Sequence, residues 1–110
     1  MPTVQLHGSV MVLRPTGPLR EENLEVINED LRPQLSGSVP HLVIDLAETP
    51  LIDGAGLEWI LDIDEECCRR GGGVRVCNVG ELCHDLFRIT DVGTSVQQFS
   101  DLTSALSSFA

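Results

Sequence analysis

The segment LIDGAGL, residues 51–57, follows the apolar run LVIDL, residues 42–46, and decides the fold expected of this chain. The pattern predicts a buried strand, a tight loop, and a helix with two glycines in its first turn. Asp53 can cap that helix, because its carboxylate accepts hydrogen bonds from the first free backbone N–H groups. Gly54 and Gly56 lack side chains, so another molecule or another part of the backbone can approach there. The positive end of the helix dipole favours an anion at this opening.

Strands and helices alternate along the rest of the chain. Apolar residues at helical spacing predict a helix over residues 21–35, which Pro33 is expected to kink or end. The alternation predicts an α/β fold with a mixed, mostly parallel sheet of four or five strands and about four helices. In chain order the other expected elements are a hairpin of strands 4–6 and 10–13, a loop over 36–40, a strand over 41–46, a helix over 54–70 and a parallel strand over 74–77.

The helix expected over residues 54–70 has one apolar face. Projection at about 100° per residue makes this the face that packs on the sheet. Asp64 falls within it and needs a partner, since an unpaired buried carboxylate is costly. Either Asp64 lies near the sheet edge and meets solvent or an arginine, or it pairs specifically with Arg75 or Arg88. The apolar face comprises Leu57, Ile60, Leu61, Cys67 and Cys68.

Trp59 projects to the opposite side of the same helix, among acidic residues that include Glu58 and Asp62. Tryptophan is strongly enriched at the residues that dominate binding energy in protein interfaces. We therefore expect Trp59 to be exposed and to contact a partner, one helical turn from the Asp53 loop. The alternative is that a loop or the neighbouring helix covers it.

Composition restricts the partners. The chain has 110 residues, 17 of them acidic and 7 basic, for a net charge of −10. This length predicts one domain over residues 1–110. The charge repels phosphate backbones and anionic lipid, so nucleic acid and membrane surfaces are poor partners and a basic or neutral protein surface fits better. No apolar run approaches the ~20 residues that span a bilayer, and the first residues lack a signal-peptide layout, so we expect a cytoplasmic protein.

The cysteines and histidines do not predict a metal centre or a catalytic site. Cys77, Cys83 and His84 suggest zinc, but the sequence has no Cys-x2-Cys pair and only one histidine nearby. Free, buried thiols fit better than either a metal site or a disulfide framework. The histidines are spread over unrelated elements, and the glycines do not complete a dinucleotide-binding motif. We therefore expect no metal, no cofactor and no enzymatic activity.

The whole pattern resembles the STAS domain family, named for sulfate transporters and anti-sigma factor antagonists. The resemblance implies a module that binds a protein partner, such as an anti-sigma factor or a related kinase-like ATPase. It is carried by residues 42–46, by residues 52–57, by a helix ending at the glycines 71–73, by residues 74–78, by a strand closing at the turn 17–19, and by residues 81–90 and 99–109 at the positions of the family's third and fourth helices.

The chain departs from this family at the loop itself. In the antagonist branch the loop reads Asp-Ser-Ser-Gly-Leu, and the partner kinase phosphorylates the second serine. The matching residues 53–57 contain no hydroxyl group, and Ala55 cannot accept a phosphoryl group. The family's Gly-x-Leu-Asp turn ends here in Arg20. If that turn packs beside the loop, Arg20 and the helix start would face one small anion site; alternatively, Arg20 is solvated or paired with a nearby glutamate.

Three functions follow from these residues and this resemblance. The first is a regulatory module that binds its protein partner and that phosphorylation of this loop cannot switch. The second is an accessory STAS subunit on the ATPase of an ABC-type transport complex, and the third is a nucleotide or small-anion sensor. The expected partner-binding residues are Asp53, Gly54, Ala55, Gly56, Glu58, Trp59 and Asp62, and the candidate anion- or nucleotide-binding residues are Arg20, Gly54 and Ala55.

Overall fold

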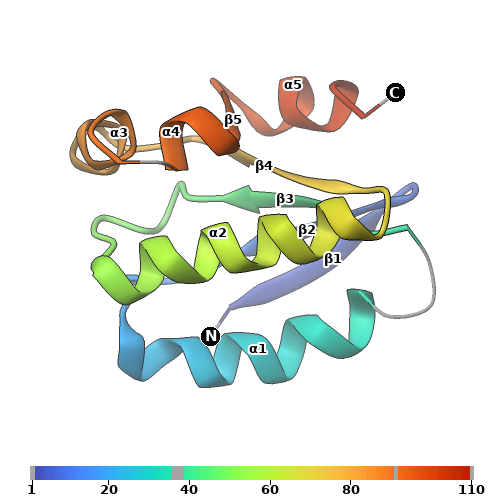
Figure 1. The fold of residues 1–110 in the computed structure, drawn as a ribbon, viewed down its shortest axis with the longest axis horizontal. Coiled ribbons are helices and arrows are strands. Elements are labelled where there is room, and N and C mark those ends of the chain that lie inside the picture. The colour runs from blue at the N-terminus through green and yellow to red at the C-terminus, as the bar shows by residue number, and fades with distance from the viewer. Residues whose placement is uncertain (1, 36–38, 91, 110) are drawn as a thin grey trace.

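A computed structural model describes residues 2–35, 39–90 and 92–109, which form a five-stranded sheet and five helices (Figure 1). The α/β fold predicted from the alternating elements is confirmed. The elements are β1 (Thr3–His7), β2 (Val10–Arg14), α1 (Glu21–Leu35), β3 (His41–Asp45), α2 (Gly54–Arg69), β4 (Gly73–Cys77), α3 (Glu81–Arg88), α4 (Val92–Ser95), β5 (Gln97–Phe99) and α5 (Leu102–Ser107).

The strands lie in the order β1-β2-β3-β4-β5. β1 is antiparallel to β2, and the other neighbours are parallel. Each parallel connection passes through at least one helix, as parallel pairing requires. The carboxyl ends of β2, β3 and β4 therefore meet at one edge of the sheet, and the loops that follow them form one end of the molecule.

Helices cover both faces of this sheet. Figure 1 shows α1 and α2 running side by side on one face, with α5 on the other. Alternate residues of each strand point to opposite faces, so Leu13 of β2 belongs to the core beneath α1 and α2, whereas Val12 packs toward α5. The larger core also contains Phe87 of α3, which is fully buried.

Trp59 is buried, so the prediction that it is exposed is wrong. Only 6% of it is accessible, and its Nε1 donates a 2.7 Å hydrogen bond to Oδ1 of Asn28 in α1. The neighbouring helix covers it because α1 lies against this side of α2. The buried face of α2 is therefore rotated about the helix axis relative to the apolar face predicted from the sequence. The buried residues of α2 are Gly56, Trp59, Ile60, Ile63 and Cys67, whereas Leu57 and Leu61 are half-buried and Cys68 is exposed.

Two local expectations are also revised. α1 does not end at Pro33 but continues to Leu35, so only two helical residues follow the proline, which lacks the N–H that would bond to the carbonyl four residues earlier. Residues 97–99 form strand β5, so the terminal helix begins only at Leu102. Of the two alternatives for Asp64, contact with solvent agrees with the structure, since Asp64 is only half-buried and accepts the Val74 N–H at 3.2 Å. Within the described chain it forms no ion pair with Arg75 or Arg88. The loop expected over 36–40 lies partly outside the described residues.

Candidate functional site

The Asp53 loop is held by the Asp53 carboxylate, which caps one helix and bonds to the start of another. Its Oδ1 accepts the Gly56 N–H at 2.8 Å, the capping bond expected for α2. Its Oδ2 accepts the Glu21 N–H at 3.2 Å, at the first residue of α1. One carboxylate therefore joins the positive ends of two helices. The anion that the helix start favours is supplied by the protein itself.

Gly56 lets two backbone segments come together. A Cβ at this position would lie 2.6 Å from the Leu19 carbonyl oxygen and 2.8 Å from Cγ2 of Ile52. Leu19 and Ile52 form a parallel bridge, and the Asp53 N–H donates to the Leu19 oxygen at 3.1 Å. The turn at residues 17–19 thus packs beside the loop. The close backbone approach expected at Gly56 is present.

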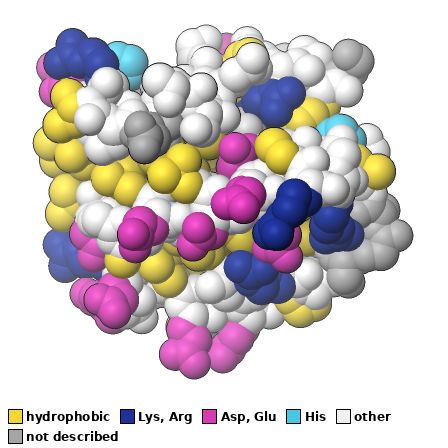
Figure 2. Space-filling view, viewed as in Figure 1, with side chains coloured by type: hydrophobic (Ala, Val, Ile, Leu, Met, Phe, Trp, Pro, Cys, Tyr) yellow, Lys and Arg dark blue, Asp and Glu magenta, His cyan; other side chains and the backbone are white. Residues whose placement is uncertain are grey.

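The remaining loop residues present a surface. A Cβ at Gly54 would meet nothing within 4 Å, so this position faces open space. Glu58 and Asp62 are exposed one helical turn apart beyond it, and Arg20 is exposed on the neighbouring turn. Figure 2 shows acidic side chains gathered over α1 and α2. The structure therefore places Gly54 and Ala55 at the start of α2 and Glu58 and Asp62 along its exposed side. Gly56 is buried against the turn, and Trp59 faces α1.

An ionic cluster around the buried Asp45 lies at the carboxyl ends of β2, β3 and β4, and sequence reasoning missed it. Asp45 is 1% exposed. Its Oδ2 accepts from Nε and Nη2 of Arg14 at 3.0 and 2.8 Å. Its Oδ1 accepts from the Ala47 N–H and from Nδ2 of Asn78, both at 3.0 Å. The sequence feature that could have revealed this cluster is a polar residue at or just after the end of each of three neighbouring strands.

This cluster keeps Asp45 charged despite its burial. Burial alone would raise the pKa of Asp45, but the hydrogen bonds from Asn78, Ala47 and Arg14 outweigh it, so the pKa lies below its ordinary value. The same contact with Asp45 raises the pKa of Arg14. All four donors belong to the protein, and Arg14 donates twice to the same carboxylate oxygen, Oδ2. We infer that the cluster fixes the strand ends from which the functional loops leave.

The thiols are poor nucleophiles and poor metal ligands, because both roles need the thiolate. Burial raises the pKa of Cys67 to about 11 and that of Cys77 to about 12. Cys83 is buried and its Sγ donates to the Thr49 carbonyl oxygen at 3.7 Å. In the part of the chain that the structure describes, no three His, Cys, Asp or Glu side chains are grouped to hold a metal ion.

Comparison with known proteins places this fold in a family. The STAS domain model matches residues 1–105, and this chain belongs to the STAS domain family. No curated protein matches the sequence. No helix among the described residues has the length and apolar content needed to cross a membrane.

Solved structures share the fold at low sequence identity. A putative anti-sigma factor antagonist from Thermotoga maritima superposes with a TM-score of 0.89 at 17% identity, covering 97% of this chain and 92% of that one. The phosphorylated Bacillus cell fate determinant SpoIIAA gives 0.75 at 15%, covering 100% of each chain. The murine Solute Carrier 26 family member A9 anion transporter gives 0.74 at 18%, covering 93% of this chain and 18% of the transporter. None of these matches indicates an enzyme family.

Proposed function

We propose that this chain is a non-catalytic regulatory module that binds a protein partner through the Asp53 loop and the exposed side of α2. The proposal rests on one observation: hydrogen bonds fix the backbone of the Asp53 loop, while part of the loop surface remains free to contact a partner. The Asp53 carboxylate and the close approach at Gly56 hold its backbone, while Gly54 faces open space. A loop already held in one conformation loses little entropy when a partner binds.

The proposed contact surface consists of five residues that lie around the start of α2. Glu58 and Asp62 give it negative charge, and the close pairing of the turn and the loop places Arg20 at its margin. We expect the partner to present a basic or neutral surface, since charge complementarity raises the association rate and excludes acidic competitors. Trp59 contributes indirectly, by holding α2 against α1. The surface residues are Arg20, Gly54, Ala55, Glu58 and Asp62.

We further propose that phosphorylation of this loop does not control binding. Residues 53–57 contain no hydroxyl group, whereas the fold is shared by a protein whose phosphorylated form has been solved. The partner class that fits best is an anti-sigma factor or related kinase-like ATPase, in the cytoplasm. The chain would then behave as an antagonist that is permanently unphosphorylated at this loop.

A second candidate is an accessory subunit of a transport complex. Its support is the similarity to part of an anion transporter. A nucleotide or small-anion sensor is less well supported, because the Asp53 carboxylate already occupies the positive helix ends where an anion would bind. Genes that neighbour this one would distinguish the first two functions: a kinase-like ATPase with a sigma factor, or a transporter ATPase with a permease.

Charge reversal tests the proposed surface. Partners are first captured from native lysate with the wild-type protein, and the strongest is purified and titrated by calorimetry. We expect Glu58→Arg and Asp62→Arg each to weaken its binding about tenfold, while Glu25→Arg, an equal change on an exposed part of α1, has little effect. Equal affinities for all three variants would place the interface elsewhere.

A further inference from the structure

Strand β1 is an open edge of the sheet. Among the described strands it pairs with β2 alone, so one side of its backbone has no strand partner. Its sequence, TVQLH, contains no lysine, arginine, acid or proline, the residues with which proteins block strand addition at exposed edges. Four of its five residues are exposed. β1 therefore has the features of a strand that can accept another.

A groove runs between this strand and α1. The register pairs Val4 with Leu13 and Leu6 with Met11, which places Val4 and Leu6 on the face that α1 covers. Yet Leu6 remains 66% exposed, and Val26 of α1 is 47% exposed. The helix thus covers β2 and leaves the β1 side of this face open. We call this region the β1–α1 groove.

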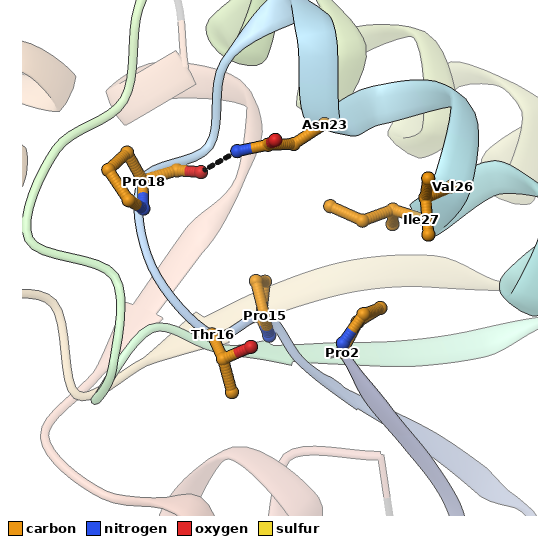
Figure 3. A pocket seen from close by; sticks show the side chains of 7 residues that line it. All are labelled: Pro2, Pro15, Thr16, Pro18, Asn23, Val26 and Ile27. Atoms are coloured by element: carbon orange, nitrogen blue, oxygen red, sulfur yellow. Dashed lines mark hydrogen bonds between the residues drawn. The ribbon is translucent and has the colours of Figure 1, made fainter.

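The groove has a hollow at each end. The first, near the start of β1, has a volume of about 200 Å³, and its lining includes Val26, Ile27 and three prolines, Pro2, Pro15 and Pro18 (Figure 3). The second, near the end of β1, has a volume of about 140 Å³, and its lining includes Leu6, Met11 and Leu35. The first hollow lies between Pro2, the residue before β1, and α1. The second lies between Leu6 of β1 and the end of α1, and residues 39–41 at the start of β3 close it.

The first hollow is held open by rigid walls. Proline rings restrict the backbone, and Nδ2 of Asn23 donates a 2.7 Å hydrogen bond to the Pro18 carbonyl oxygen, which ties α1 to the turn. Figure 3 shows Pro2, Pro15, Val26 and Ile27 around the same space. A ligand side chain would enter without reorganising these walls, which favours binding.

The negative charge of α1 indicates which kind of segment the β1–α1 groove would bind. α1 carries five acidic residues and one arginine, and Glu22, Glu29 and Asp30 are exposed within one helical turn of Val26. Antiparallel pairing of two copies through β1 would place two such acidic helices on the same face of a joined sheet, where they repel. A basic segment from another protein meets no such repulsion and gains attraction instead.

We propose that the β1–α1 groove binds an extended, basic segment of another protein, which pairs with the open edge of β1 and extends the sheet. Apolar side chains on one face of that segment enter the two hollows. Pro2 and Leu6 are four residues apart, and four residues of strand span about 13 Å, so the two anchoring side chains are also four positions apart. This site is separate from the Asp53 loop and does not rest on the function proposed above.

A designed peptide tests this site directly. The probe is acetyl-Lys-Leu-Lys-Val-Lys-Leu-Lys-amide, whose two leucines are four positions apart, titrated into ¹⁵N-labelled protein. We expect amide shifts concentrated in Thr3–His7 and at Val26, with α5 unchanged. A peptide with proline in place of the valine and of the lysine after it, and with one lysine added at its end to keep the charge, lacks an N–H that faces β1 in either register and should bind at least about tenfold more weakly. A version with glutamate in place of lysine should not bind.

Matched variants distinguish binding of the peptide at the groove from a general attraction between a basic peptide and an acidic protein. Leu6→Arg should weaken binding of the probe about tenfold or more, because it blocks the second hollow with a like charge. Ile89→Arg alters a comparably exposed residue, 74% accessible at the C-terminal end of α3, and should change binding less than about twofold. Folding of both is checked by Trp59 fluorescence.

Three results would overturn the proposal. The proline peptide could bind as tightly as the probe, which would show attraction by charge alone. The largest shifts could fall outside β1 and α1. Sedimentation of the free protein could show a dimer whose formation shifts the β1 amides, in which case the edge is an interface between copies of this chain.

Discussion

Replacement of Gly56 by alanine should destabilise the protein although alanine is the better helix former. The new Cβ would lie 2.6 Å from the Leu19 carbonyl oxygen and 2.8 Å from Cγ2 of Ile52. The first atom belongs to the backbone and also accepts the Asp53 N–H at 3.1 Å, so it cannot move without weakening that bond.

The size of the effect follows from three contributions. Overpacking costs about 1–3 kcal/mol, and weakening one hydrogen bond costs about 1 kcal/mol more. Alanine regains about 1 kcal/mol over glycine in a helix. We therefore expect the free energy of unfolding to fall by about 2 kcal/mol.

Equilibrium unfolding in urea measures this change, with the fluorescence of the buried Trp59 as the signal. Gly54→Ala is the matched control, since its Cβ would meet nothing within 4 Å. That variant should be as stable as wild type or slightly more stable. If Gly56→Ala unfolds at the same urea concentration as Gly54→Ala, the tight contact between the turn and the loop is not what requires glycine.

Three further predictions concern the core and the thiols. Asn28→Ala should lower the free energy of unfolding by about 1–2 kcal/mol and shift the Trp59 emission to longer wavelength, because the smaller side chain removes the acceptor and lets water reach the indole N–H; an unchanged spectrum together with unchanged stability would contradict the role of this bond. The pKa of Asp45 is lower in the folded protein, so its contribution to stability is complete above the ordinary value of 3.8 and is lost as pH falls below it. Asp45→Asn should therefore reduce the slope of stability against pH in acid, as measured by urea unfolding at a series of pH values, and an unchanged slope would refute this. With a thiol-reactive dye at pH 8, Cys68 should be labelled faster than the other three cysteines of the native protein, because it is exposed and they are buried, although burial and the nearby Asp64 also raise the pKa of Cys68; mass spectrometry of the labelled peptides identifies it, and equally fast labelling of all four would contradict the burial of the other three.

The features predicted correctly are those that depend on neighbouring residues in the chain. Asp53 caps α2 because the side chain of a residue just before a helix lies beside the free N–H groups of the first turn. The strand at 41–45 was recognisable because a strand buried on both faces is continuously apolar. In both cases the local sequence carries the physical cause.

The features missed depend on contacts between distant segments. The burial of Trp59 is caused by α1, which begins 38 residues earlier in the chain, and a projection of one helix cannot show what lies beside it. The cluster of Arg14, Asp45 and Asn78 exists because three strands end at one edge of the sheet, so it required the strand order. Strand β5 has only three residues and is polar at two of them, too short for a periodic signal.

The central claim is that the protein partner binds at the Asp53 loop and that phosphorylation there does not control it. The most direct test measures the affinity of the purified partner, by calorimetry with and without ATP, for wild type, Ala55→Ser and Ala55→Asp. We predict that wild type binds equally in both conditions, that Ala55→Ser without ATP matches it, and that Ala55→Asp loses at least about tenfold in affinity, because its larger, charged side chain has to be desolvated within the contact. Binding of Ala55→Asp as tight as that of wild type, with its fold intact by Trp59 fluorescence, would show that this loop is not the interface.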